Sequence, residues 1–280
     1  MEGEGAGMRY ALELPRTVSA SLAGAHLGRQ AGASLEFRDH RDYQPGDDLR
    51  RIDWNAYARS DRLTVKLYRE EISPHLDIIV DGSRSMAIES SAKARAALGL
   101  SAAFAVAAEN AGYSHLAWLA RDFIAPIGNG ANRPSQWQSF DFDFRGNPAD
   151  GFLRSPARFR SQGMRVLISD LLWLGEPLAV LQSLARGAAS VVVAQILATV
   201  DTDPPERGRV RLVDSETEEQ REIFIDDGAI RRYQDALARH QQNWRRACRQ
   251  IGAVMVALTA EEVVRDWNLE ELVIAQILKV

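Results

Sequence analysis

The sequence predicts an α/β fold in which a mostly parallel sheet carries helices on both faces. From Leu76 onward, short apolar runs alternate with longer segments of helical periodicity, which is the pattern of consecutive βαβ units. The apolar runs are rich in β-branched residues and nearly continuous in hydrophobicity, as strands covered on both faces require. Upstream of Leu76 the chain is dense in charges of both signs. We therefore expect an N-terminal charged extension over residues 1–72, with a flexible tail over 1–20, and a sheet domain over 73–280.

Each element of the sheet domain follows from its local pattern. The central strands are expected at residues 76–80, 166–169, 191–197 and 253–258, and a further strand pair at 114–120 and 123–127. Two short runs at 209–213 and 222–225 flank a polar stretch and predict a hairpin at one edge of the sheet. Helical periodicity is found at 91–111, 176–187, 227–249 and 260–267, and a last helical turn is expected from Glu270.

Composition excludes several classes of protein. The 280 residues are 46% hydrophobic and 26% charged, which is typical of a globular protein. The formal net charge of −4 argues against a nucleic-acid binder, which carries a basic surplus.

The most apolar helical stretch, Leu98 to Ala108, is too short to span a bilayer, so we expect no membrane insertion. The acidic start does not match a secretory signal, and a single cysteine, Cys248, fits a reducing compartment. A cytoplasmic location is expected.

A candidate metal site follows the first central strand. Asp81, Ser83 and Ser85 come directly after the run that ends at Val80, and Asp170 ends the run that begins at Met164. Ligands of open α/β sheets bind at the carboxyl ends of the strands. Two carboxylates with two or three hydroxyls form an oxygen ligand set that suits Mg²⁺ or Mn²⁺. The alternative is structural, because Asp and Ser are also ordinary residues of strand-to-helix turns and helix caps.

A long polar loop is a second candidate. The segment from Asn129 to Ala149 is rich in Asn, Pro, Gly and Asp, with Trp137 and Phe140 among its aromatic residues. Long loops of this kind tend to be functional or to cover a site. We expect Trp137 and Phe140 to contact a partner, with the equally weighted alternative that they only pin the loop to the protein body.

The charged stretch of the N-terminal extension makes the chain recognisable. Residues 37–54 read FRDHRDYQPGDDLRRIDW, and the motif YARSD over 57–61 and Lys66 follow. This stretch resembles the MoxR-associated family of von Willebrand A-like proteins, which is also called domain of unknown function fifty-eight. We expect its Arg50, Arg51, Asp53 and Trp54 to form a salt-bridged cap or a partner-binding surface.

The resemblance implies a fold, a metal site and a partner. The fold would be a Rossmann-like von Willebrand A domain. Its metal-ion-dependent adhesion motif, Asp-x-Ser-x-Ser, would fall on Asp81, Ser83 and Ser85, and the later aspartate on Asp170. The family motif adds a threonine, yet no Thr lies between Thr64 and Thr199; Ser135 or Ser139 could substitute. Mg²⁺ or Mn²⁺ would then bind weakly or not at all. The implied partner is a MoxR-type AAA+ ATPase acting with a client protein.

Three functions remain open on the sequence. The first is a non-enzymatic adaptor whose metal ion accepts a partner carboxylate. The second is a metal-dependent phosphoryl or ester hydrolase that uses Asp81 and Asp170. Against the hydrolase, the chain has no Gly-x-Ser-x-Gly elbow, no phosphate-binding Gly-rich loop and no His-Glu-x-x-His. The third is an adaptor that binds only through the charged extension and whose metal motif is vestigial.

Overall fold

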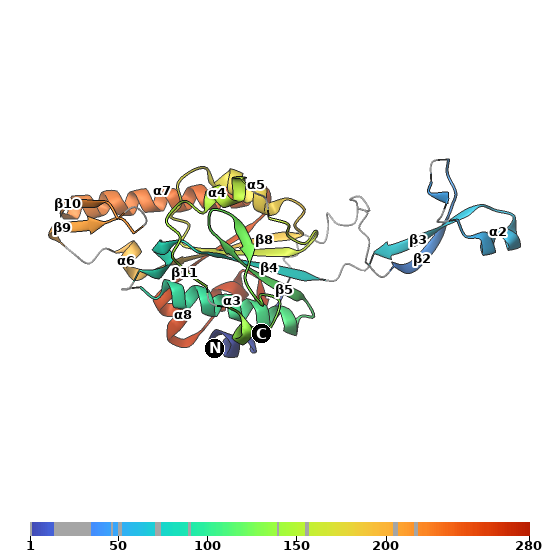
Figure 1. Cartoon of the computed structure of the whole chain (residues 1–280), viewed down its shortest axis with the longest axis horizontal. Helices are drawn as coiled ribbons and strands as arrows, with labels where there is room; N and C mark the ends of the chain where they lie inside the picture. Colours follow the sequence, from blue (N-terminus) through green and yellow to red (C-terminus); the bar gives the residue numbers. More distant parts are fainter. Residues whose placement is uncertain are drawn as a thin grey trace. The chain divides into compact units, whose positions relative to one another are not determined.

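The computed structural model describes residues 2–13, 35–45, 47–49, 52–70, 74–88, 91–138, 140–154, 157–203, 207–215 and 218–280 (Figure 1). The chain divides into two compact units, one of Met1–Ala23 with Pro74–Val280 and the other of Gly24–Ser73. No helix within these described ranges is long and apolar enough to cross a membrane.

A six-stranded sheet forms the centre of the larger unit. Its strands are β4 (His75–Asp81), β5 (Ser114–Ala120), β6 (Ile124–Pro126), β7 (Met164–Ser169), β8 (Ser190–Leu197) and β11 (Val254–Thr259). Their order is β11-β8-β7-β4-β5-β6. All neighbours are parallel except β5 and β6, which are antiparallel. The predicted mostly parallel α/β architecture is confirmed.

Helices cover both faces of this sheet (Figure 1). Side chains alternate along each strand, so Ile78 packs in one core with α3 (Lys93–Asn110), α8 (Ala260–Asp266) and α9 (Glu270–Ile274). The next residue, Ile79, packs in the opposite core with α4 (Ala149–Arg154), α5 (Pro177–Ala185) and α7 (Asp227–Ile251). The predicted helices therefore supply most of both covering layers. Helix α4 was not predicted from the sequence, and neither were the short helical turns η2 (Arg84–Ala87), η3 (Pro134–Gln136) and α6 (Thr199–Thr202).

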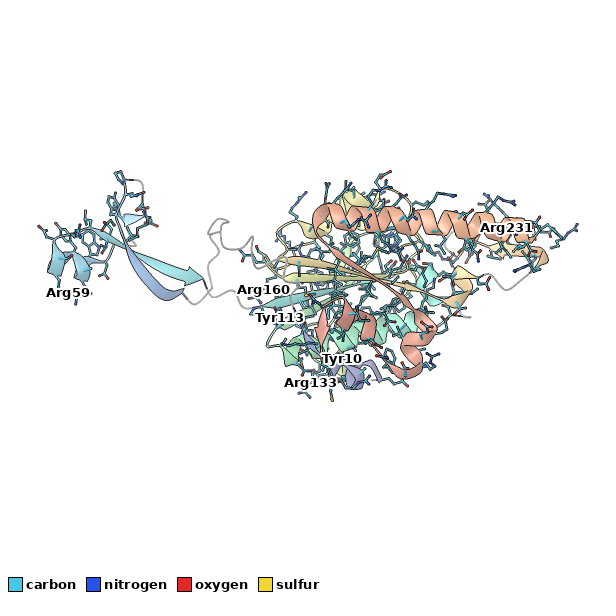
Figure 2. The ribbon with its side chains drawn as sticks, turned by 180° about the vertical axis from the view of Figure 1, so that it is seen from behind. Tyr10, Arg59, Tyr113, Arg133, Arg160 and Arg231 are labelled. Carbon is cyan, nitrogen blue, oxygen red and sulfur yellow. The ribbon has the colours of Figure 1, made fainter. Side chains whose placement is uncertain are left out.

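The N-terminal segment differs from the flexible tail that the sequence predicts. Helix α1 (Glu2–Gly7) packs on α3, and β1 (Ala11–Leu12) pairs with β12 (Leu278–Lys279) near the end of the chain. The Tyr10 hydroxyl, labelled in Figure 2, accepts a hydrogen bond from the Leu269 amide at 3.3 Å. The prediction was wrong for residues 2–13 because glycines, which weaken a helix in isolation, here permit close helix packing. Residues 14–20 lie outside the described residues.

Gly99 is the point of closest packing on α3. A Cβ added there would lie 1.8 Å from the Trp267 ring, and one added at Gly3 would lie 2.0 Å from the Gly99 carbonyl oxygen. We expect Gly99→Ala to lower the free energy of unfolding by about 1–3 kcal/mol, the usual cost of overpacking. The matched control is Gly5→Ala on α1, where a Cβ would meet nothing within 4 Å. Chemical denaturation should show little change for the control, and equal stability of both variants would contradict the packing.

The predicted hairpin is present but is not an edge of the large sheet. Strands β9 (Gly208–Val213) and β10 (Gln220–Ile225) pair only with each other, as a separate two-stranded sheet. The edges of the large sheet are β11 and β6. The sequence reveals the pairing of the two runs through their polar turn, but it contains no signal for where a hairpin docks.

The smaller unit is a β-hairpin with a short helix between its strands. Strands β2 (Leu35–Asp42) and β3 (Thr64–Glu70) are antiparallel. Helix α2 (Trp54–Ser60) begins after Asp53, whose carboxylate accepts hydrogen bonds from the amides of Asn55 and Ala56 at 3.0 and 3.1 Å. It ends at Asp61, which adopts the left-handed conformation.

Candidate functional site

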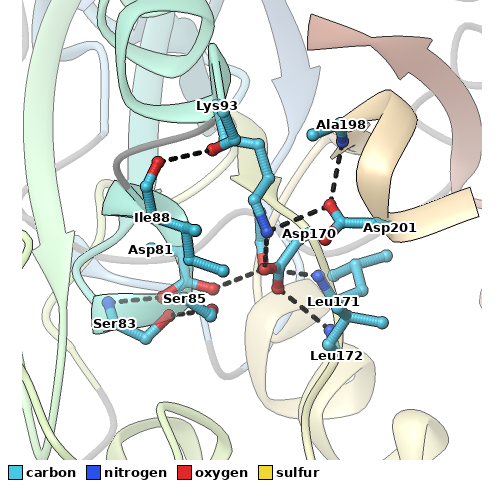
Figure 3. Close-up of polar contacts among 12 residues, drawn as sticks. Asp81, Ser83, Ser85, Ile88, Lys93, Asp170, Leu171, Leu172, Ala198 and Asp201 are labelled. Carbon is cyan, nitrogen blue, oxygen red and sulfur yellow. Dashed lines mark hydrogen bonds and ion pairs between the residues drawn. The ribbon is translucent and has the colours of Figure 1, made fainter. Parts of the chain in front are cut away.

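The predicted acidic and hydroxyl side chains meet at the carboxyl edge of the large sheet. Asp81 ends β4 and Asp170 directly follows β7, its neighbour in the sheet. The chain continues from β4 to β5 on one side while β7 lies on the other, so strand order reverses beside Asp81. The Asp81 carboxylate accepts from the Ser83 amide at 2.8 Å, and the Ser83 and Ser85 hydroxyls are 3.0 Å apart (Figure 3).

Asp81 is fully buried and receives its hydrogen bonds from within the protein. Its second carboxylate oxygen accepts from the Ser169 hydroxyl at 2.6 Å and from the Trp173 indole N–H at 2.8 Å. Burial, together with the nearby charge of Asp170, raises the pKa of the Asp81 carboxyl to about 6. Ser169 and Trp173 lie on either side of the predicted Asp170, and the sequence alone did not single them out.

Lys93 is a further site residue that sequence reasoning missed. Its Nζ atom lies 2.9 Å from Asp170 Oδ2 and 3.1 Å from Asp201 Oδ2, and its side chain is 0% exposed (Figure 3). Burial alone would lower the pKa of the Lys93 ammonium, but the charges of Asp170 and Asp201 and the hydrogen bonds to them raise it above its ordinary value. A signal was available: Lys93 is the first residue of α3, where a cation opposes the helix dipole.

The carboxylates around Lys93 are held in place by neighbouring backbone and side chains. Asp170 Oδ1 accepts from the Leu172 amide at 3.1 Å, and the Asp170 carbonyl accepts from the Gln195 side chain at 3.1 Å. Asp201 Oδ2 accepts from the Ala198 amide at 2.9 Å, which caps the short helix after β8. The ends of β4, β7 and β8 thus contribute to one buried polar cluster.

The arrangement does not fit a resident divalent cation as it stands. A Mg²⁺ ion bound to Asp170 would have to lie close to the Lys93 ammonium, and at about 4 Å that repulsion is roughly 8 kcal/mol at an effective dielectric constant of about 20. Moreover, the Ser83 and Ser85 hydroxyls bond to each other. Among the described residues, no group of three His, Cys, Asp or Glu side chains is arranged to hold a metal ion. The metal site at Asp81, Ser83, Ser85 and Asp170 stays a prediction.

Of the two serines proposed to replace the missing threonine, the structure describes only Ser135, and its hydroxyl bonds elsewhere. The Ser135 hydroxyl lies 3.4 Å from the Glu4 carboxylate, so it bonds to helix α1. Ser139 lies outside the described residues. A hydroxyl that does bond to Asp81 is that of Ser169, at 2.6 Å.

The aromatic loop packs partly against the protein body. Trp137 and Phe140 are half-buried on the α3 core, and their rings meet edge to face with centroids 5.9 Å apart. The Trp137 indole N–H donates to the Asn132 carbonyl at 2.8 Å. Further along, the backbone at Phe144 bridges to Ser83, next to the acidic cluster. The loop therefore borders the site, while a partner-binding role for Trp137 and Phe140 stays a prediction.

The charged extension only partly matches the expected ion network. Arg50 and Arg51 lie outside the described residues. Asp53 is buried as the N-cap of α2, and its own amide donates to the Thr64 carbonyl at 2.9 Å. Trp54, the first residue of α2, is 60% exposed. Of the two expectations for this stretch, a salt-bridged cap and a partner-binding surface, an exposed ring fits the surface better, and a partner-binding role for Trp54 stays a prediction.

A second buried cluster lies at the opposite, amino edge of the sheet. Asp77 accepts from the Trp118 indole at 2.8 Å and lies 3.3 Å from His75 Nε2, while His75 Nδ1 lies 2.8 Å from the Ser114 hydroxyl. That hydroxyl also lies 3.2 Å from the Pro74 carbonyl and is contacted by Arg160 at 3.2 Å. These bonds tie the start of β4 to β5.

Comparison with known proteins identifies the family. The model of the family described as "Protein of unknown function DUF58" matches residues 39–243. The chain belongs to this family. Uncharacterized proteins of Mycobacterium bovis and Mycobacterium tuberculosis are each 30% identical to the DUF58 chain over 272 residues, which is 91% of this chain and 83% of theirs. The family membership expected from residues 37–66 is confirmed.

Solved structures show weaker likeness to this DUF58 protein. The conserved hypothetical protein BatB from Bacteroides thetaiotaomicron aligns with a TM-score of 0.35 and 11% identity, over 72% of this chain and 98% of that one. An aerotolerance-related membrane protein from Bacteroides fragilis aligns with a TM-score of 0.37 and 12% identity, over 70% and 97%. At TM-scores this low, the alignments say nothing about what this chain does.

Proposed function

We propose that this DUF58 protein is a non-enzymatic interaction module with a von Willebrand A-type sheet unit. It works as an adaptor for a MoxR-type AAA+ ATPase in assembling or activating a client complex. The choice of this ATPase as the partner rests on the resemblance of residues 37–66 to the MoxR-associated family. The von Willebrand A assignment is supported by the parallel sheet with Asp81, Ser83 and Ser85 at its carboxyl edge.

The observation that carries the proposal is a group of exposed apolar side chains on the smaller unit. Trp54 is 60% exposed, and Leu49, Tyr57 and Leu63 are 61%, 38% and 39% exposed. The Trp54 and Tyr57 rings meet edge to face with centroids 6.2 Å apart. Tryptophan and tyrosine are the residues most enriched in the energetic centres of protein interfaces. We call Trp54 and Tyr57, whose rings are in contact, the aromatic patch.

The hydrolase alternative gains no support from the site. Catalysis by Asp81 and Asp170 would require a carboxylate that reaches substrate or water. Both side chains are 0% exposed, and their oxygens already accept hydrogen bonds from Ser169, Trp173, Lys93 and backbone amides.

The test is capture of the host's purified MoxR-type ATPase by the full-length chain. We expect Trp54→Ala to weaken capture at least tenfold, because truncating a central aromatic residue costs over about 1.4 kcal/mol of binding. Phe224→Ala is the matched control, since Phe224 is also an exposed aromatic residue, at 70%, but lies on the β9–β10 hairpin. Equal capture by wild type and Trp54→Ala would contradict the role of the aromatic patch.

A further inference from the structure

We propose that the Lys93 ammonium is a built-in replacement for the metal ion of this site, so that the carboxyl edge of the sheet is complete without a divalent cation. The inference concerns the sheet unit alone and does not depend on the ATPase partner.

The position of the ammonium is the first reason. Lys93 Nζ lies within ion-pair distance of Asp170 and Asp201, two carboxylates that follow the neighbouring strands β7 and β8. Asp170 is the acid that the sequence pattern assigns to a metal ion. The ammonium therefore offsets the negative charge of carboxylates from two adjacent strand ends, as a metal ion bound there would.

Burial is the second reason. The side chains of Lys93 and Asp170 are both 0% exposed, and that of Asp201 is 10% exposed. Charges at such depth are tolerated only when they are paired and hydrogen-bonded. The ammonium therefore cannot move out to solvent by itself, because both carboxylates would then be buried without a counter-charge.

The state of the remaining ligands is the third reason. The Ser83 hydroxyl bonds to that of Ser85, and Asp81 Oδ2 already accepts from both Ser169 and Trp173. Protein donors thus occupy the oxygens that an octahedral ion would require. The absence of a threonine from residues 65–198 fits the same conclusion, since a site that holds no metal needs no further hydroxyl ligand.

The experiment compares thermal unfolding in EDTA and in millimolar Mg²⁺ or Mn²⁺. The melting temperature of the wild type is expected to be the same in both, because a ligand raises stability only if it binds the folded state. Lys93→Ala, which removes the charge and leaves space, should melt lower in EDTA and regain part of the loss in Mg²⁺. Lys93→Met, which removes the charge but fills the space, should melt lower in both conditions.

The control is Lys279→Ala, which removes the same charge from an exposed position and should behave as the wild type. Stabilisation of the wild type by Mg²⁺ that is lost in Asp170→Asn would overturn the proposal. So would a folded Lys93→Ala variant without any response to metal, because the carboxylates would then form no cation site. If neither Lys93 variant folds, calorimetric titration of the wild type with Mg²⁺ decides: absence of binding heat supports the proposal, and saturable binding overturns it.

Discussion

Lys93→Met is expected to lower the free energy of unfolding by about 3–5 kcal/mol, because it leaves Asp170 and Asp201 buried without their counter-charge. The ion pairs at 2.9 and 3.1 Å and the complete burial of the lysine carry this expectation. Urea denaturation near neutral pH measures it, with Lys279→Met as the exposed control. A loss no greater than that of the control would show that the ammonium is dispensable.

A double-mutant cycle separates the contribution of the Lys93–Asp170 ion pair from that of the packing of the Lys93 side chain. If the pair with Asp170 is the main interaction, Lys93→Met combined with Asp170→Asn should be less destabilising than the sum of the two single changes. Coupling between residues in contact usually lies at about 0.5–3 kcal/mol. Additive effects would mean that Lys93 contributes through packing of its aliphatic stem.

The second large effect is on pH dependence, through Asp81. Its pKa of about 6 in the folded protein lies above the ordinary value of 3.8, so the folded state binds more protons than the unfolded state between these values. Stability from this group is present at low pH and is lost as pH rises from about 4 through 6. A shift of about two units corresponds to roughly 3 kcal/mol.

Comparison of the wild type with Asp81→Asn isolates this contribution. Both oxygens of the Asp81 carboxylate accept hydrogen bonds, one from Ser169 and Trp173 and the other from the Ser83 amide. In the asparagine variant an NH₂ group replaces one of these oxygens and faces a donor. The variant should therefore be less stable than the wild type at pH 4 by about 1–3 kcal/mol. Because the variant has no carboxyl group to ionise, the deficit should shrink as pH rises to 7. A deficit that is constant across this range would show that Asp81 does not titrate there.

The strands and the polar residues that directly follow them could be predicted from the sequence, because both depend on local pattern. Strand β4 is an apolar run followed by Asp81, and β7 is a run followed by Asp170, so their shared edge follows from parallel pairing alone. A lysine at the start of a helix is a local signal, but its partners could not be found in this way, because the contact between Lys93 and Asp201 joins the start of α3 to the segment after β8. Only the folded arrangement of three strand ends brings those groups together.

Other differences have equally physical causes. Helix α1 is rich in glycine, which weakens a helix by itself, yet glycine lets it approach α3 closely enough for backbone contact. Trp54 is apolar and adjacent to many charges, a pattern that fits a buried network as well as an exposed interface. Side-chain direction from a short helix decides between them, and sequence spacing does not encode it.

A crystal structure of the wild type grown in millimolar Mn²⁺, with anomalous scattering to locate the metal, tests most directly whether the Lys93 ammonium replaces a metal ion. We expect Lys93 Nζ to lie between the Asp170 and Asp201 carboxylates, and no anomalous peak to lie within coordination distance of Asp81, Ser83, Ser85 or Asp170. A manganese peak bound to Asp170, with the Lys93 side chain displaced from it, would show instead that the site holds a metal ion.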